Sequence, residues 1–167
     1  MDVTATLAVF GQLAVSLTGF AGLLTAFDSG HDGWTAAEIA ALRNLFLNSV
    51  GALAFSVAPI PFLSGGVDPD MVMSIACLAL ALYFTALFIG AVDYVFRLKG
   101  KPRSQIIYWG FTLGEAPLAA LLAFAAFGVG SISAVGAFCA GLMWLLAMGT
   151  AQFIFQIFWS LQAAGKR

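Results

Sequence analysis

Five long apolar stretches, separated by short polar or glycine-rich segments, make up most of the sequence. An α-helix needs about 20 predominantly apolar residues to cross the hydrocarbon core of a bilayer, and each stretch reaches that length. The stretches cover residues 3–27, 36–63, 70–96, 105–127 and 134–162. We therefore predict an all-α integral membrane protein, a bundle of about five transmembrane helices in which residues 1–167 form a single polytopic membrane domain.

The segment 128–133 is the least distinct of the four boundaries, because it contains glycine and serine but no charged residue. A single bent element across this segment leaves a chain with four spans. We prefer five, since residues 105–162 accommodate two crossings, whereas one crossing leaves about half of them unplaced at about 1.5 Å per residue. Pro59 and Pro61, which lack an amide hydrogen, predict an end or a kink in the second helix.

The seven lysines and arginines determine the expected orientation. Basic residues are retained on the cytoplasmic side of a membrane, and five spans with an external N-terminus place all seven there. They are Arg43, Arg97, Lys99, Lys101, Arg103, Lys166 and Arg167. Four spans would put the last two on the side opposite to residues 97–104. We therefore predict an N-out, C-in topology with segment 97–104 and the C-terminus in the cytoplasm.

The composition excludes several classes of protein. Apolar residues make up 62% of the chain and charged residues 9%, whereas a soluble domain usually carries about 25% charged residues. A net charge of −1 provides no basic field for nucleic acid. Cys77 and Cys139 lie within apolar stretches and His31 is the only histidine, so no disulfide framework or multi-histidine metal site is available. We expect no metal and no cofactor, and the lipid bilayer as the main partner.

Glu115 is the carboxylate that the sequence places deepest in a predicted span. It follows Ser104 by 11 residues, about 16 Å along an unbroken helix, which is close to the bilayer midplane. A lone carboxylate in hydrocarbon must be protonated, paired with a cation such as Arg43, or in contact with water. Pro117 cannot donate to the carbonyl of Leu113, which would leave backbone near Glu115 open to a ligand or a neighbouring helix.

Amide side chains recur at helical spacing in two of the predicted spans. Asn44 and Asn48 lie one turn apart on the second span, and Gln152 and Gln156 lie one turn apart on the fifth. We hypothesise that they converge on one polar core open to the cytoplasm. This predicted polar intramembrane site comprises Arg43, Asn44, Asn48, Glu115, Gln152 and Gln156. The alternative is that the amides form separate interhelical hydrogen bonds worth about 0.6 kcal/mol each.

Small residues at four-residue spacing indicate where helices approach one another closely. They are Ala14, Thr18 and Gly22 on the first span, with Gln12, Ser16 and Gly19 beside them, and Gly110 and Gly114 on the fourth. We expect both sets to pack against helices of this chain or of other subunits. The basic residues Arg97, Lys99, Lys101 and Arg103 are expected to contact anionic lipid or a partner.

The loops are too short for a soluble domain, so the protein acts within the bilayer or through partners. The sequence has no GxSxG elbow and no phosphate-binding loop, and we expect no enzymatic activity. Our first hypothesis is an oligomeric channel or transport protein for protons, ions or small solutes, with Glu115 at its centre. The alternative is a non-catalytic accessory or assembly subunit of a larger membrane complex. A membrane enzyme acting on a lipid or quinone would require a lateral opening near Glu115.

Overall fold

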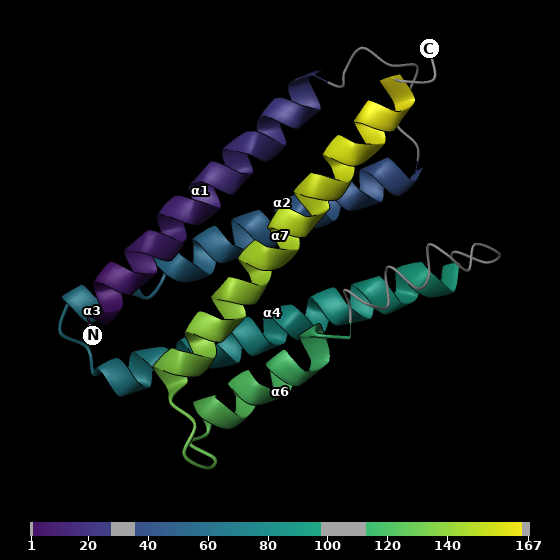
Figure 1. The fold of residues 1–167 in the computed structure, drawn as a ribbon. Helices are drawn as coiled ribbons and strands as arrows, with labels where there is room; N and C mark the ends of the chain where they lie inside the picture. The colour runs from purple at the N-terminus through teal and green to yellow at the C-terminus, as the bar shows by residue number, and fades with distance from the viewer. Residues whose placement is uncertain (1, 28–35, 98–112, 165–167) are drawn as a thin grey trace. The chain divides into compact units, whose positions relative to one another are not determined.

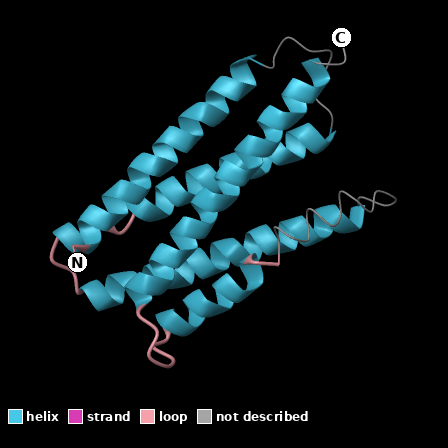
Figure 2. Ribbon diagram, in the orientation of Figure 1, coloured by secondary structure: helices cyan, strands magenta, loops and turns pink. Residues whose placement is uncertain are grey.

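The computed structural model describes residues 2–27, 36–97 and 113–164, and every regular element in these ranges is an α-helix (Figures 1 and 2). The helices are α1 (Val3–Phe27), α2 (Ala36–Val57), α3 (Ile60–Ser64), α4 (Pro69–Arg97), α6 (Glu115–Ala126) and α7 (Ala134–Ala164). The prediction of an all-helical chain is confirmed for this part of the sequence.

Four of the described helical segments are long and apolar enough to cross a membrane. They are Val3–Leu23, Ile39–Ser64, Pro69–Tyr94 and Ala134–Phe158. The remaining apolar helix, α6, has 12 residues and extends about 18 Å at about 1.5 Å per residue. It follows a turn at Leu113 and Gly114, so within the predicted helix 105–127 the described helix begins at Glu115, and residues 105–112 lie outside the described residues.

The ends of several helices are set by side chains that the sequence supplies at the first turn. The Asp2 carboxylate accepts hydrogen bonds from the backbone amides of Thr4 (2.9 Å) and Ala5 (3.3 Å) at the start of α1. The Ser133 hydroxyl accepts one from the Gly136 amide at 3.3 Å at the start of α7. Such caps satisfy amides that have no partner within the helix.

The expected turn at residues 128–133 is confirmed, and its geometry requires glycine. The Gly128 amide donates to the Ala125 carbonyl at 3.2 Å and the Val129 amide donates to the Phe124 carbonyl at 2.9 Å, the two bonds of a Schellman motif. Gly128 has a backbone φ of +66°, a value that residues with a Cβ rarely adopt. The break expected near the prolines is also present, because α2 ends at Val57 and α3 begins at Ile60.

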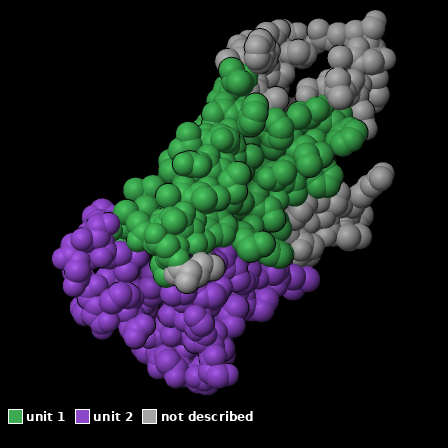
Figure 3. Space-filling model, turned by 60° about the vertical axis from the view of Figure 1, so that its left-hand side comes forward, with its two compact units in different colours: residues 1–60, 142–167 green, residues 61–141 purple. Residues whose placement is uncertain are grey.

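The chain divides into two compact units (Figure 3). Unit 1 comprises residues 1–60 and 142–167, and unit 2 comprises residues 61–141. In unit 1, α1, α2 and the larger part of α7 pack around Leu17, Ala21 and Leu45, which are 9%, 0% and 0% exposed. The rings of Phe20 and Phe153 add a contact between α1 and α7, with their centroids 5.8 Å apart.

In unit 2, α4 packs along α6 and against the first residues of α7. A Cβ added at Gly141 of α7 would lie 2.8 Å from the Leu80 Cδ2 and 3.4 Å from atoms of Phe84 and Leu122. These three side chains are fully buried. The Cys77 thiol donates to the Ala134 carbonyl at 3.2 Å. Gly141 therefore permits a close approach between α7 and α4.

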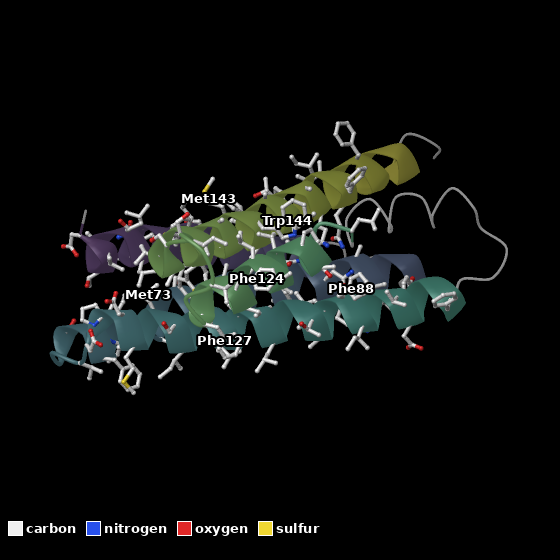
Figure 4. The ribbon with its side chains drawn as sticks, turned by 90° about the horizontal axis from the view of Figure 1, so that it is seen from below. Met73, Phe88, Phe124, Phe127, Met143 and Trp144 are labelled. Carbon is white, nitrogen blue, oxygen red and sulfur yellow. The ribbon has the colours of Figure 1, made fainter. Side chains whose placement is uncertain are left out.

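Many large apolar side chains of both units point outward. Phe127, Met143 and Leu82 have exposed fractions of 73%, 62% and 64%, and Figure 4 shows Met143 projecting from α7. Water-soluble monomers rarely expose contiguous apolar patches larger than a few hundred Å². This distribution is compatible with helices that are surrounded by lipid.

Candidate functional site

A pair of amides, Asn48 buried and Gln152 half-buried, joins α2 to α7 in unit 1. The Asn48 Nδ2 donates to the Gln152 Oε1 at 3.3 Å and to the backbone carbonyl of Asn44, one turn earlier, at 2.9 Å. Asn48 is only 5% exposed. Its Oδ1 is buried and has no hydrogen-bond partner among the described residues. An amide oxygen in an apolar environment costs free energy unless it accepts a hydrogen bond. The Asn48 amide is therefore satisfied at its nitrogen but not at its oxygen.

Asn44 and Gln156 extend the pair by one turn on each helix. The contacts between Ser49 and Gly149 and between Asn48 and Gln152 run in opposite directions along α2 and α7, so the two helices are antiparallel. Asn44 and Gln156 therefore follow the central pair in the same direction, and both are half-buried. We call Asn44, Asn48, Gln152 and Gln156 the amide seam.

The amide seam lies within the apolar length of its helices. Asn48 is nine residues from Ile39, where the apolar window that includes α2 begins, and Gln152 is six residues from the end of the α7 window at Phe158. These separations correspond to about 14 Å and about 9 Å along the helix axes. If the windows span a bilayer, the seam lies inside the hydrocarbon region rather than at the headgroups.

Gly149 brings α7 into close contact with both other helices of unit 1, one turn before Gln152. A Cβ added to it would lie 2.6 Å from the Leu17 Cδ2 on α1 and 3.4 Å from the Ser49 Oγ on α2. Ser49 is fully buried and donates to the Leu45 carbonyl at 2.8 Å. Ser49 was not among the residues predicted for the polar intramembrane site. The signal that could have indicated it is its position directly after Asn48.

Hydroxyl groups in the helices behave differently from the amides. Thr18, Ser49, Thr85 and Thr150 each donate to the carbonyl four residues earlier in their own helix, at 2.8 Å. Such local bonds occupy the hydroxyl hydrogen without a second helix. A primary amide has two donor hydrogens and an acceptor oxygen, so it cannot be satisfied by one such bond. The four amides of the seam therefore require partners beyond their own helices.

Glu115 lies in unit 2, at the first position of α6, with Gly114 as the N-cap residue. Its Oε2 is buried and has no hydrogen-bond partner among the described residues. The carboxylate is close enough to Tyr83 of α4 to act on its phenol electrostatically. A negative charge at this end of a helix is favoured by the unpaired amides and the helix dipole.

The depth of Glu115 and the free backbone near it stay predictions. The depth was calculated along a helix that includes residues 105–114, whereas Leu113 and Gly114 form a turn and residues 105–112 lie outside the described residues. Pro117 is the third residue of α6, so the Leu113 carbonyl to which it cannot donate lies in the turn before the helix.

The other predicted residues are distributed as follows. The Arg43 side chain is exposed on α2. Arg97 is the last residue of α4, while Lys99, Lys101, Arg103 and Gly110 lie outside the described residues. Glu115 and the amide seam belong to different units, so their convergence stays a prediction. Within the described ranges, no group of three or more His, Cys, Asp or Glu side chains is arranged to hold a metal ion.

The predicted packing stripe on α1 is only partly directed at the rest of unit 1. Ala14 is fully buried and Thr18 is half-buried, whereas Gly22 is exposed and a Cβ there would meet nothing within 4 Å. On the fourth predicted span, Gly114 is half-buried. The buried face of α1 also includes Gly11, where an added Cβ would lie 3.2 Å from the Ser56 Oγ. The predicted stripe included Ala14 of this face but not Gly11, because large Leu7 and Leu17 share the face.

Comparisons of the chain with protein-family models, with curated proteins and with solved structures find no significant match in any of the three.

Proposed function

We propose that the chain is a membrane protein with five spans, an external N-terminus and a cytoplasmic C-terminus. Four apolar helical segments of sufficient length and the turn at 128–133 support this arrangement. The fourth span would consist of α6 and the residues that precede it. Five spans place all seven basic side chains on one side of the membrane, as the positive-inside rule requires.

Single cysteines in a variant without Cys77 and Cys139 test this topology. We expect an impermeant thiol reagent to label Val67→Cys and Val129→Cys from outside intact cells, because both positions are in exposed turns between spans. Ser104→Cys and Lys166→Cys should react only after the membrane is permeabilised. Labelling of Lys166→Cys from outside, with Val129→Cys protected, would establish four spans instead.

We further propose that the protein is an oligomeric channel or transport protein for protons, ions or small solutes. The observation that carries this proposal is the amide seam, in which the Asn48 Oδ1 is buried within an apolar helix bundle and has no partner among the described residues. Polar groups at such positions destabilise the folded protein unless they bind something. Amides can both donate and accept hydrogen bonds, so they can replace part of the hydration of a passing solute.

Glu115 supplies the second argument for transport. A carboxyl group with a buried oxygen, at the start of α6 and within the proposed fourth span, is a costly feature for a protein in lipid. Such a group can take up and release a proton and carries a full negative charge when ionised, whereas an amide of the same shape does neither. The proposal therefore gives Glu115 a role in coupling or selecting the transported species.

Ion and solute flux into liposomes containing the purified protein tests this function. We expect flux of at least one of protons, alkali cations or small neutral solutes above that of protein-free vesicles. Glu115→Gln should reduce or uncouple this flux because it removes the ionisable group and preserves the shape. Asp70→Asn is the matched control, since Asp70 is exposed in the first turn of α4.

Absence of flux for every species, or flux that Glu115→Gln leaves unchanged, would contradict the role given to Glu115. If the protein without flux also purifies in mild detergent with stoichiometric heterologous subunits, it is the accessory subunit of our alternative hypothesis.

A further inference from the structure

Helix α1 has a second regular face, which unit 1 does not use. Its buried face includes Leu7, Gly11, Ala14 and Ala21. The opposite side carries a row of exposed residues at alternating spacings of four and three. This row consists of Ala5, Val9, Gln12, Ser16, Gly19 and Leu23. Alternating four- and three-residue spacing is the repeat with which two helices pack side by side in a left-handed pair. We call these six residues the outer face of α1.

Gln12 is the unusual residue of the outer face. It lies nine residues after Val3, about 14 Å along the apolar window that begins there, and its side chain is exposed. The neighbouring Ser16 hydroxyl donates to the backbone carbonyl of Gln12 at 3.0 Å and so does not serve its side-chain amide. Unit 1 leaves this amide exposed, and a polar group that faces hydrocarbon must find a partner.

A second copy of this chain meets the requirements of the outer face. The Gln12 amide carries donors and an acceptor, so two identical amides satisfy one another across a twofold axis. A fixed topology gives every copy the same orientation, which places identical residues of two α1 helices opposite one another. Close approach is possible because Ala5, Ser16 and Gly19 are small, and a Cβ added at Gly19 would meet nothing within 4 Å.

We propose that the protein forms a parallel homodimer through the outer face of α1, with Gln12 of one copy hydrogen-bonded to Gln12 of the partner subunit. This inference rests on the membrane insertion proposed above but not on the transported species. Interhelical hydrogen bonds between amides and the packing of small residues provide the stabilisation. The dimer would present the amide seam of each copy separately, one seam for each subunit.

Energy transfer between labelled copies, measured in lipid vesicles over a range of protein-to-lipid ratios, tests the dimer. Gln12→Leu and Gly19→Leu should each weaken association about tenfold, because the first removes the amide pair and the second separates the helices. Gly90→Leu on α4 is the matched control for Gly19→Leu, since Gly90 is also exposed and an added Cβ meets nothing within 4 Å. Its association should equal that of the wild type.

Disulfide formation locates the interface. In the variant without native cysteines, Ser16→Cys and Gly19→Cys should oxidise to covalent dimers, whereas Leu82→Cys, on an exposed part of α4, should not. A chain that remains monomeric at every ratio, or dimers that all three leucine variants leave unchanged, would overturn the proposal. Failure of the protein to insert into the membrane would be seen separately, in the thiol labelling of Val67→Cys and Val129→Cys. Loss of transport would be seen only in the flux measurement.

Discussion

Gly149→Leu is expected to destabilise unit 1 by about 3 kcal/mol, at the upper end of what overpacking of a core usually costs. The reason is local crowding, because a Cβ alone would already lie 2.6 Å from the Leu17 Cδ2 and 3.4 Å from the Ser49 Oγ. A full leucine side chain must displace both α1 and α2 from α7. The free energy of unfolding, measured by titrating a denaturing detergent into mild micelles, gives the value directly.

Two controls distinguish crowding at Gly149 from a general effect of leucine in a membrane helix. Gly90→Leu makes the same substitution where an added Cβ meets nothing within 4 Å, and it should leave the free energy of unfolding nearly unchanged. Gly149→Ala should be partly rescued by Leu17→Ala, since the second change removes the atom that the new Cβ meets. Equal effects of Gly149→Leu and Gly90→Leu, or additive effects of the two alanine substitutions, would contradict the packing described for unit 1.

Asn48→Leu and Gln152→Met are each expected to destabilise the protein by about 1–3 kcal/mol, because each leaves the other amide, which is buried or half-buried, without its partner. The double variant should recover most of that stability. Replacing both members of a buried polar pair by apolar groups of similar shape is often neutral, and here it also removes the Oδ1 that has no partner among the described residues. The three variants and the wild type form a thermodynamic cycle in the same unfolding assay.

A coupling energy near zero between the two positions would show that the hydrogen bond of 3.3 Å contributes nothing in the folded protein. A double variant less stable than either single variant would show that both amides stabilise unit 1 through other contacts. The second result would contradict the expectation that the buried Asn48 Oδ1 costs stability in the folded protein.

The helices were predictable from the sequence because an uncharged apolar stretch in lipid can satisfy its backbone only as a helix. The ends were also visible: Asp2 and Ser133 cap α1 and α7, and Gly128 adopts the positive φ that ends α6. The turn at Leu113 and Gly114, directly before α6, was not visible. Its only local signals are glycines, which occur throughout this chain and cost a helix only about 1 kcal/mol each.

The pairing of side chains was harder to predict than the helices. The spacing of Asn48 and Gln152 placed each on a polar stripe, and the structure joins them by a hydrogen bond. In contrast, the buried and exposed faces of α1 could not be distinguished, because both are apolar and both contain small residues. Gly22 was selected and is exposed, while Gly11 was overlooked and is buried. Only the position of the neighbouring helices determines which face is used.

The measurement that tests the central claim most directly is flux through liposomes containing the Asn48→Leu/Gln152→Met variant, compared with the wild type at equal amounts of folded protein. If the amide seam conducts a solute, the wild type produces flux and the double variant, although stably folded, falls to the level of protein-free vesicles. Equal flux from the two proteins would contradict the claim, because the seam would then be a packing feature and not a pathway.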